Sequence, residues 1–277
     1  MNNSKNSILL VDPEFDPHTA PDCNLLLKIT GDSFSYAVID KNSRQLKAVF
    51  DQQDCEDTVK ELGLALKNDS YLRLPFREIK VSVYTPDTIA VPNRFFNAQD
   101  LSSYANFFSE EAPGKLYTQP FARFGFNSVF KLEQFAEDTL NTYLSGAAKY
   151  EQNAPVLALA PTAEESSLLL DFTAGSFNAL LLAKDKVLFQ NNFQVENTEE
   201  FTYYLLLLIQ ELELDTTAVS VLLSGIIHQE DDYYSCLNKY FHQIHFNLPP
   251  ADDIDHAILE DMPAHYYSTL LALDLCV

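Results

Sequence analysis

Short apolar runs alternate with polar turns over the first part of the chain. Aliphatic and aromatic side chains fill the runs, and Gly, Asp, Asn and Ser fill the connections, a pattern that favours strands joined by hairpins. Apolar positions at three- and four-residue spacing then predict an amphipathic helix. The predicted elements are strands over 25–29, 36–39 and 46–50, a helix over 56–67 and a strand over 78–84.

The same order of elements returns later in the chain. Asn197 is the predicted N-cap of the second helix, and Glu199 and Glu200 follow in its first turn, where carboxylates favour the positive end of the helix dipole. The predicted elements are strands over 167–172, 177–182 and 187–193, a helix over 197–212 and a strand over 219–223.

The two stretches also match residue by residue. The segment from Ile29 to Phe34 and the segment from Phe172 to Phe177 keep Thr, Ser and Phe in register at an offset of 143 residues. Two β-β-β-α-β units at one offset indicate an internal duplication. We therefore expect an α/β protein with a first half over 1–160 and a second half over 161–277.

A less regular, Phe-rich insertion separates the two repeats. It spans 85–160, contains several prolines, and includes two segments, 117–121 and 125–130, that are expected to pair as strands before a helix over 132–144. We interpret its phenylalanines, from Phe95 to Phe130, as core; the alternative is a patch that binds a partner. A last helix is expected to begin near Pro263 and run towards Leu273.

The charge balance excludes several classes of partner. The chain carries 40 acidic and 18 basic residues, a net charge of -22, so nucleic acids and anionic membranes would be repelled.

The four cysteines form no CxxC motif, and the polar start of the chain has no apolar signal-peptide core. The longest apolar run, 205–209, is too short to span a bilayer. These features predict a cytoplasmic protein.

Two β-β-β-α-β units in one chain resemble the actin-like ATPase superfamily, which has a ribonuclease H-like fold and includes sugar kinases, Hsp70 and actin. More narrowly, the chain resembles the DUF3822 family of Bacteroidetes proteins. The resemblance implies two halves with a cleft between them. It also implies a phosphate loop in the first hairpin of each half, and an adenosine site after a strand of the second half that ends in a glycine pair. It implies no established activity.

The first phosphate loop departs from the superfamily pattern. The expected aspartate falls on Lys28, which the alignment places opposite Asp171, and a lysine cannot accept a hydrogen bond from metal-bound water. Asp32 adds a carboxylate at the tip of the loop, where phosphate oxygens would be repelled. This loop is therefore expected to bind nucleotide poorly.

The second loop is closer to the pattern. If a nucleotide binds, the resemblance implies that Asp171, Thr173, Gly175 and Ser176 line its phosphate site and that Gly225 lines its adenosine site. The alternative interpretation is a strand end followed by an ordinary hairpin turn, because Gly and Ser are common turn residues. Gly225 is the one glycine left of the expected pair.

Two further features weaken the nucleotide interpretation. Ile226 adds a branched side chain that would narrow the adenosine site. The chain also has seven glycines, few for a backbone that wraps around a nucleotide twice.

No other motif predicts a reaction. A G-x-S-x-G elbow and an HExxH motif are both absent. His242 and His245 would face opposite sides of a strand, so no metal site is predicted there or at the acidic residues that follow them. The residues in question are His242, His245, Asp252, Asp253, Asp255 and His256.

Two hypotheses remain. The first is a non-catalytic actin-like scaffold that binds an unknown protein partner and needs no cofactor. The second is a phosphotransferase or ATPase that uses ATP and Mg²⁺ through unusual phosphate loops. Lys28 and Asp32 favour the scaffold.

Overall fold

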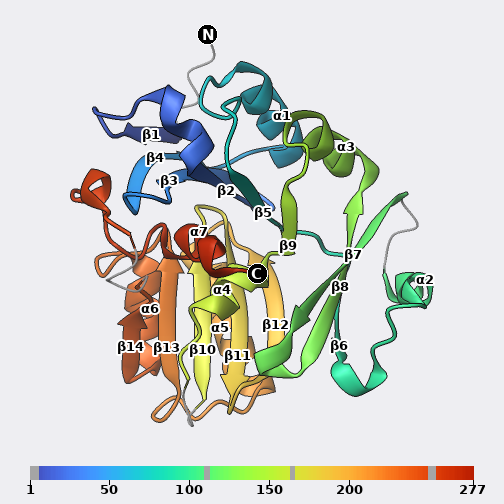
Figure 1. The fold of residues 1–277 in the computed structure, drawn as a ribbon. Helices are drawn as coiled ribbons and strands as arrows, with labels where there is room; N and C mark the ends of the chain where they lie inside the picture. The colour runs from blue at the N-terminus through green and yellow to red at the C-terminus, as the bar shows by residue number, and fades with distance from the viewer. Residues whose placement is uncertain (1–5, 109–112, 163–165, 249–253) are drawn as a thin grey trace.

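The strands of the protein assemble into two large sheets and one small sheet (Figure 1). The structure is a computed structural model, and it describes residues 6–108, 113–162, 166–248 and 254–277. Within these ranges the sheets have six, five and three strands. The six-stranded and five-stranded sheets each form the centre of one half of the molecule.

The first large sheet has the strand order β1-β4-β3-β2-β5-β9. Strands β2, β3 and β4 form an antiparallel meander, whereas β5 lies parallel to β2, and β9 lies parallel to β5. Its strands are β1 (Ser7–Val11), β2 (Cys23–Ile29), β3 (Phe34–Asp40), β4 (Gln45–Gln52), β5 (Glu78–Val83) and β9 (Ala148–Glu151).

The second large sheet repeats this arrangement. Its order is β12-β11-β10-β13-β14, with two antiparallel pairs followed by two parallel pairs. Lys28 pairs with Ser35 across the first hairpin, and Asp171 pairs with Asn178 at the equivalent place in the second. The strands are β10 (Ser167–Phe172), β11 (Ser176–Ala183), β12 (Lys186–Gln194), β13 (Ser220–Gly225) and β14 (Gln243–Phe246).

This common topology confirms the predicted fold class: an α/β protein of actin-like fold with two βββαβ-containing halves. The hairpins that contain Thr30 and Thr173 occupy equivalent places in the two sheets, as the offset predicted. The boundary between residues 160 and 161 stays a prediction, and residues 163–165, just after it, lie outside the described residues.

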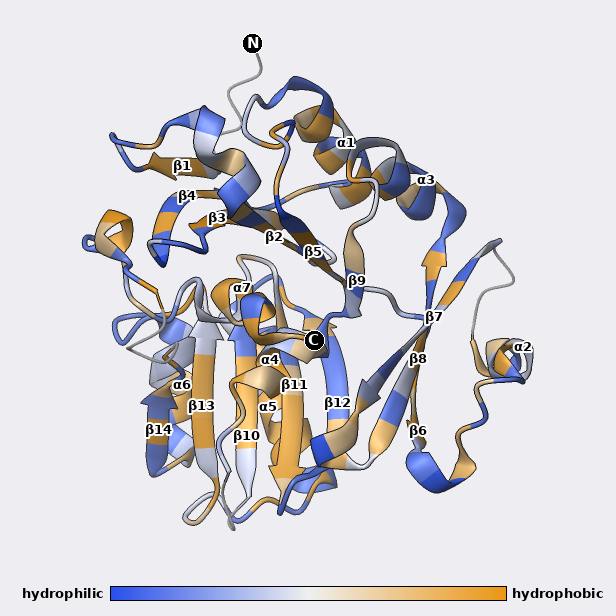
Figure 2. Cartoon of the chain, in the orientation of Figure 1, coloured by the Kyte–Doolittle hydropathy of each residue, from blue (hydrophilic) through white to orange (hydrophobic). Residues whose placement is uncertain are grey.

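Helices cover the outer face of each large sheet. α1 (Thr58–Asn68) and α3 (Gln134–Tyr143) pack Leu62, Leu66 and Leu140 on the first sheet. α5 (Thr198–Glu211) and α6 (Asp232–Tyr240) cover the second sheet, where Phe201 and Leu205 are fully buried. The inner strands β11 and β13 are strongly hydrophobic (Figure 2), as expected for strands covered on both faces.

The predicted cap of the second helix is present. The Asn197 side chain accepts a hydrogen bond from the Glu200 N–H at 2.9 Å, and Asp57 does the same for the Lys60 N–H at 3.0 Å at the start of α1. The two helices therefore begin at equivalent places, each just after the third strand of its meander.

A third core lies between the two halves. It joins Leu26 of the first sheet, Leu169 of the second sheet and Leu270 of the C-terminal segment in one apolar cluster. Two short helices, α4 (Asn153–Ala158) and α7 (Ser268–Ala272), lie between the sheets in Figure 1. The helix expected to begin near Pro263 was thus predicted too early, because α7 begins at Ser268 and the short helix η6 (Leu273–Leu275) follows it.

The first part of the Phe-rich insertion forms the small sheet, whose order is β6-β8-β7, whereas its last part supplies α3 and β9 to the first large sheet. The strands of the small sheet are β6 (Thr88–Pro92), β7 (Gly114–Phe121) and β8 (Phe126–Glu133), and α2 (Leu101–Tyr104) lies to one side of it (Figure 1). Phe121, Phe126 and Phe130 are buried, as predicted. Phe95 and Phe107 are 64% and 74% exposed, so the prediction that the whole run is core was wrong.

Among the described residues no helix is both long and apolar enough to cross a membrane.

Candidate functional site

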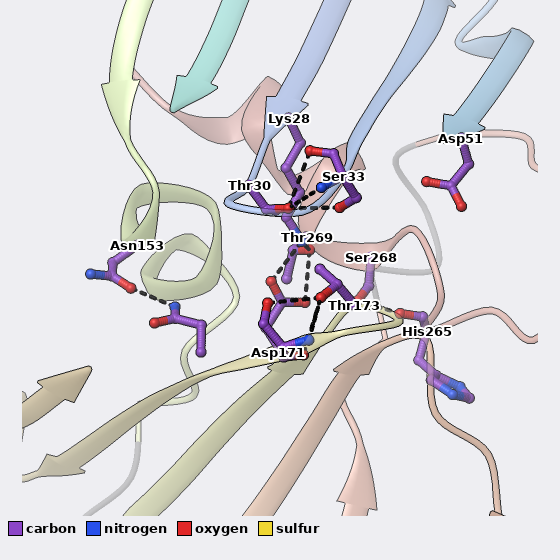
Figure 3. Close-up of polar contacts among 12 residues, drawn as sticks. Lys28, Thr30, Ser33, Asp51, Asn153, Asp171, Thr173, His265, Ser268 and Thr269 are labelled. Carbon is purple, nitrogen blue, oxygen red and sulfur yellow. Dashed lines mark hydrogen bonds and ion pairs between the residues drawn. The ribbon is translucent and has the colours of Figure 1, made fainter. Parts of the chain in front are cut away.

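Two polar loops of the same shape meet between the halves (Figure 3). The first loop is 30–33, between β2 and β3, and the second loop is 173–176, between β10 and β11. In each loop the threonine N–H donates to the serine carbonyl at 2.9 Å. The threonine hydroxyl oxygen accepts from the serine N–H, at 2.9 Å for Thr30 and 3.0 Å for Thr173. Each loop is therefore a tight turn fixed by its own threonine.

The first loop inserts a carboxylate into the second loop. One oxygen of Asp32 accepts hydrogen bonds from the Thr173 hydroxyl at 2.7 Å and from the Gly175 N–H at 3.1 Å. The Ala174 N–H donates to the side-chain carbonyl of Gln53 at 3.0 Å. Three successive backbone N–H groups of the second loop, those of 174–176, are therefore already paired inside the protein. An anionic carboxylate sits where a phosphate would need these donors.

The lysine predicted to replace the metal-organising aspartate pairs with the aspartate of the other half. Lys28 Nζ lies 2.6 Å from Asp171 Oδ2 and donates to Thr269 Oγ1 at 2.8 Å. The Thr269 hydroxyl lies 3.1 Å from Asp171 Oδ1. The Lys28 side chain is 13% exposed, and the Asp171 side chain is 6% exposed. The ammonium thus neutralises the carboxylate on which metal-bound water would depend.

The cavity that remains between the loops is very small. Its volume is about 10 Å³, which is room for about one water molecule. Two buried oxygens on its wall, Ser82 Oγ and Asn178 Oδ1, have no hydrogen-bond partner among the described residues. The space between the two loops is thus too small for a nucleotide in this conformation, since pockets for small molecules measure roughly 300–1,000 Å³.

Gly225 lies beside the second loop for a reason that involves the backbone. Its φ is 80°, and a Cβ atom at this position would lie 2.0 Å from the Phe172 carbonyl oxygen. The Ile226 N–H donates to that same oxygen at 2.9 Å. Close packing of the ends of β10 and β13 therefore requires a glycine here whether or not adenosine binds.

Two buried carboxyl groups lie at strand ends near the loops. Burial raises the pKa of Asp51, at the end of β4, to about 6. Burial also raises the pKa of Glu151, at the end of β9, to about 8, although Asn153 donates to both of its oxygens. At neutral pH Glu151 is mainly a neutral carboxylic acid.

This burial predicts a pH dependence of stability. Because folding raises the pKa of Glu151 above its unfolded value, the folded state binds more protons between about pH 4.5 and 8, and the free energy of unfolding falls as pH rises through that window. The Glu151→Gln variant cannot ionise at this position. Between pH 5 and 8 the wild type is therefore expected to lose more free energy of unfolding than the variant does, by at least about 1 kcal/mol. Urea unfolding at both pH values measures this difference. Equal losses in the two proteins would show that Glu151 ionises without cost.

The structure brings most of the predicted site residues together. Asp171, Thr173, Gly175 and Ser176 form one loop, and β-pairing places Gly225 opposite Phe172 beside it. Whether they bind a nucleotide stays a prediction. Sequence reasoning missed Gln53 and Thr269, which complete the contacts. Gln53 follows a predicted strand and gave a weak signal, whereas nothing in the sequence near Thr269 pointed to the cleft.

The described residues contain no cluster of three or more His, Cys, Asp or Glu side chains that could bind a metal ion. His245 lies on β14 with its side chain exposed, and His242 directly precedes this strand. Asp252 and Asp253 lie outside the described residues.

A family and several solved structures match this chain. The DUF3822 family, described as a protein of unknown function, matches residues 12–244. No curated protein matches the sequence. A protein with actin-like ATPase fold and unknown function from Bacteroides thetaiotaomicron is similar, with a TM-score of 0.75 and 15% identity over 95% of this chain and 99% of that one.

Two more distant structures share the fold. A chain of the PilM-PilN type IV pilus biogenesis complex has a TM-score of 0.59 and 16% identity, covering 91% of this chain and 97% of that one. The ethanolamine utilization protein EutJ from Carboxydothermus hydrogenoformans has a TM-score of 0.51 and 9% identity, covering 97% and 93%. At such identities the likeness shows the fold alone.

Proposed function

The chain belongs to the DUF3822 family, and from this premise we propose that it is a non-catalytic protein of actin-like fold whose role is to bind another protein. The observation that supports this proposal is that side chains of the first half occupy the backbone donors of the second loop. Asp32 and Gln53 occupy the backbone donors of Gly175 and Ala174 that a phosphate would need. Such a protein keeps an actin-like fold but leaves no room for a nucleotide between its two loops.

Charge supports the same proposal. Phosphoryl transfer depends on positioning and on Mg²⁺ to neutralise the phosphates. Here Lys28 is held in an ion pair with Asp171, and the carboxylate of Asp32 lies over the second loop. ATP with Mg²⁺ would have to displace both groups. The alternative, an ATP-binding phosphotransferase or ATPase, therefore requires the two halves to separate first.

A protein partner is favoured over other kinds of partner. The net charge of -22 opposes nucleic acids and anionic membranes. A chain of similar fold is found in the PilM-PilN complex, which is an assembly of proteins. We also propose a cytoplasmic location, because all four cysteines, at positions 23, 55, 236 and 276, are buried free thiols.

The proposal predicts no useful ATP turnover. The purified protein is expected to release no phosphate above background with ATP and Mg²⁺, and to show no heat of ATP binding by calorimetry. The reason is that the donors of the second loop are already paired. Turnover near the kinase range of roughly 1–100 s⁻¹, abolished in the Asp171→Ala variant, would overturn the proposal and favour the enzyme.

A further inference from the structure

A second hollow, much larger than the closed cavity, opens beside the first loop. This groove has a volume of about 320 Å³. Ile29 at the end of β2, Val83 at the end of β5 and Leu132 near the end of β8 contribute to its wall. Because β2 and β5 are parallel neighbours, their carboxyl ends open on the same edge of the sheet, where ligands of α/β proteins commonly bind. The groove also follows the seam between the first sheet and the Phe-rich insertion.

The groove combines an apolar wall with an acidic rim. Its apolar residues are Ile29, Val59, Val83, Leu132 and Ala136, and its carboxylates are Glu56, Asp57 and Glu133. The described residues that line it include no Lys, Arg or His. The side chains of Glu56 and Glu133 are exposed and have no ion-pair partner among the described residues. Ile29, Val83 and Leu132 are buried and form the floor of the groove, whereas Val59 and Ala136 are half-buried. The groove therefore presents negative charge next to a small apolar surface.

The start of α1 does not offset this charge. Its N–H groups would attract an anion, but the Asp57 side chain accepts from the Lys60 N–H at 3.0 Å. Glu61 accepts from the Glu56 N–H at 3.0 Å. Asp57 and Glu61 thus place two carboxylates at the positive end of the α1 dipole, which they offset.

We propose that this groove docks a peptide segment of a partner protein in which a Lys or Arg is flanked by apolar side chains. The cation pairs with the rim carboxylates, and the flanking side chains cover the apolar wall. This inference rests on the proposed function, because it names the kind of partner that the protein binds. The chain is itself poor in basic residues, 18 among 277, so a basic segment is more readily supplied by another protein.

Fluorescence anisotropy with synthetic peptides tests this inference. The probe is a short labelled peptide that carries lysines among leucines, and its counterpart carries glutamates in place of the lysines. The lysine peptide is expected to bind, and the glutamate peptide is not. The double variant Glu56→Gln/Glu133→Gln should weaken binding at least about 10-fold, since two rim charges are lost. Ala136→Phe, which fills the groove without changing charge, should weaken binding to a similar extent.

A matched control separates the groove from the general negative charge. The double variant Glu199→Gln/Glu211→Gln removes the same charge from exposed positions of α5 in the other half, and should leave binding unchanged. Equal weakening by both double variants, or no effect of Ala136→Phe, would overturn the groove as the docking site. Full competition by spermine would show a site for free polyamines instead. ATP turnover would overturn the proposed function, whereas a missing peptide interaction without turnover would overturn only the groove.

Discussion

Replacing Lys28 with alanine is expected to lower the free energy of unfolding by about 3–5 kcal/mol, because it leaves the buried Asp171 carboxylate without its partner. The side chain of Asp171 is 6% exposed, and its neutralising ammonium comes from the other half of the molecule. The loss should therefore also loosen the contact between the halves. Chemical denaturation measures the change, and hydrogen exchange of the 30–33 and 173–176 amides reports the loosening.

Two further variants give this prediction its control. Lys41 and Asp274 form another ion pair of 2.6 Å between the halves, but the Lys41 side chain is 34% exposed, so Lys41→Ala should cost no more than about 1 kcal/mol. The double replacement Lys28→Met/Asp171→Leu removes both charges and should recover most of the lost stability. A loss no larger for Lys28→Ala than for Lys41→Ala would mean that solvent screens the Lys28 pair as well.

Gly225→Ala is expected to destabilise the protein by more than about 3 kcal/mol, since left-handed strain and overpacking each cost about 1–3 kcal/mol. The new Cβ atom would lie 2.0 Å from the Phe172 carbonyl oxygen, which is a backbone atom that cannot rotate away. The ends of β10 and β13 would have to separate beside the second loop. Thermal unfolding gives the measurement.

Gly146 offers the matched control for this variant. Its φ of 81° is close to that of Gly225, but a Cβ atom there would have no neighbour within 4 Å. Gly146→Ala should therefore cost only about 1 kcal/mol, the part that comes from backbone conformation alone. Equal losses in the two variants would show that strain, and not the contact with Phe172, makes Gly225 necessary.

The four strands that each large sheet shares with the other, β2 to β5 and β10 to β13, were predictable because their signals are local, whereas β1 and β9 at the edges of the first sheet were not predicted. Each half alternates apolar strands with turn residues over short distances, and the match between Thr30 and Thr173 needs only a comparison of the chain with itself. The short helices between the halves were less accessible. α4 was not predicted, and α7 was predicted with too early a start, because both lie in a core shared by distant segments and lack a long periodic pattern.

The site was predictable in its members but not in its contacts. The alignment of Lys28 with Asp171 identified two residues that form an ion pair. It treated Lys28 as a departure from the phosphate-loop pattern and Asp171 as a match to it, and did not predict their contact. Asp32 was expected to repel phosphate from its own loop, whereas it accepts hydrogen bonds from the other loop. Contacts between residues 143 apart depend on how two sheets pack, which local sequence patterns do not encode.

The position of the C-terminal segment has a consequence for biosynthesis. Lys80 of β5 is buried and donates to the carbonyl oxygens of Asp274 and Cys276, at 2.9 and 2.6 Å. A ribosome makes β5 almost two hundred residues before these acceptors. Until these carbonyls are made, the Lys80 ammonium has to donate its hydrogen bonds to water. The two halves are therefore expected to complete their docking only after residues 274–276 have been made.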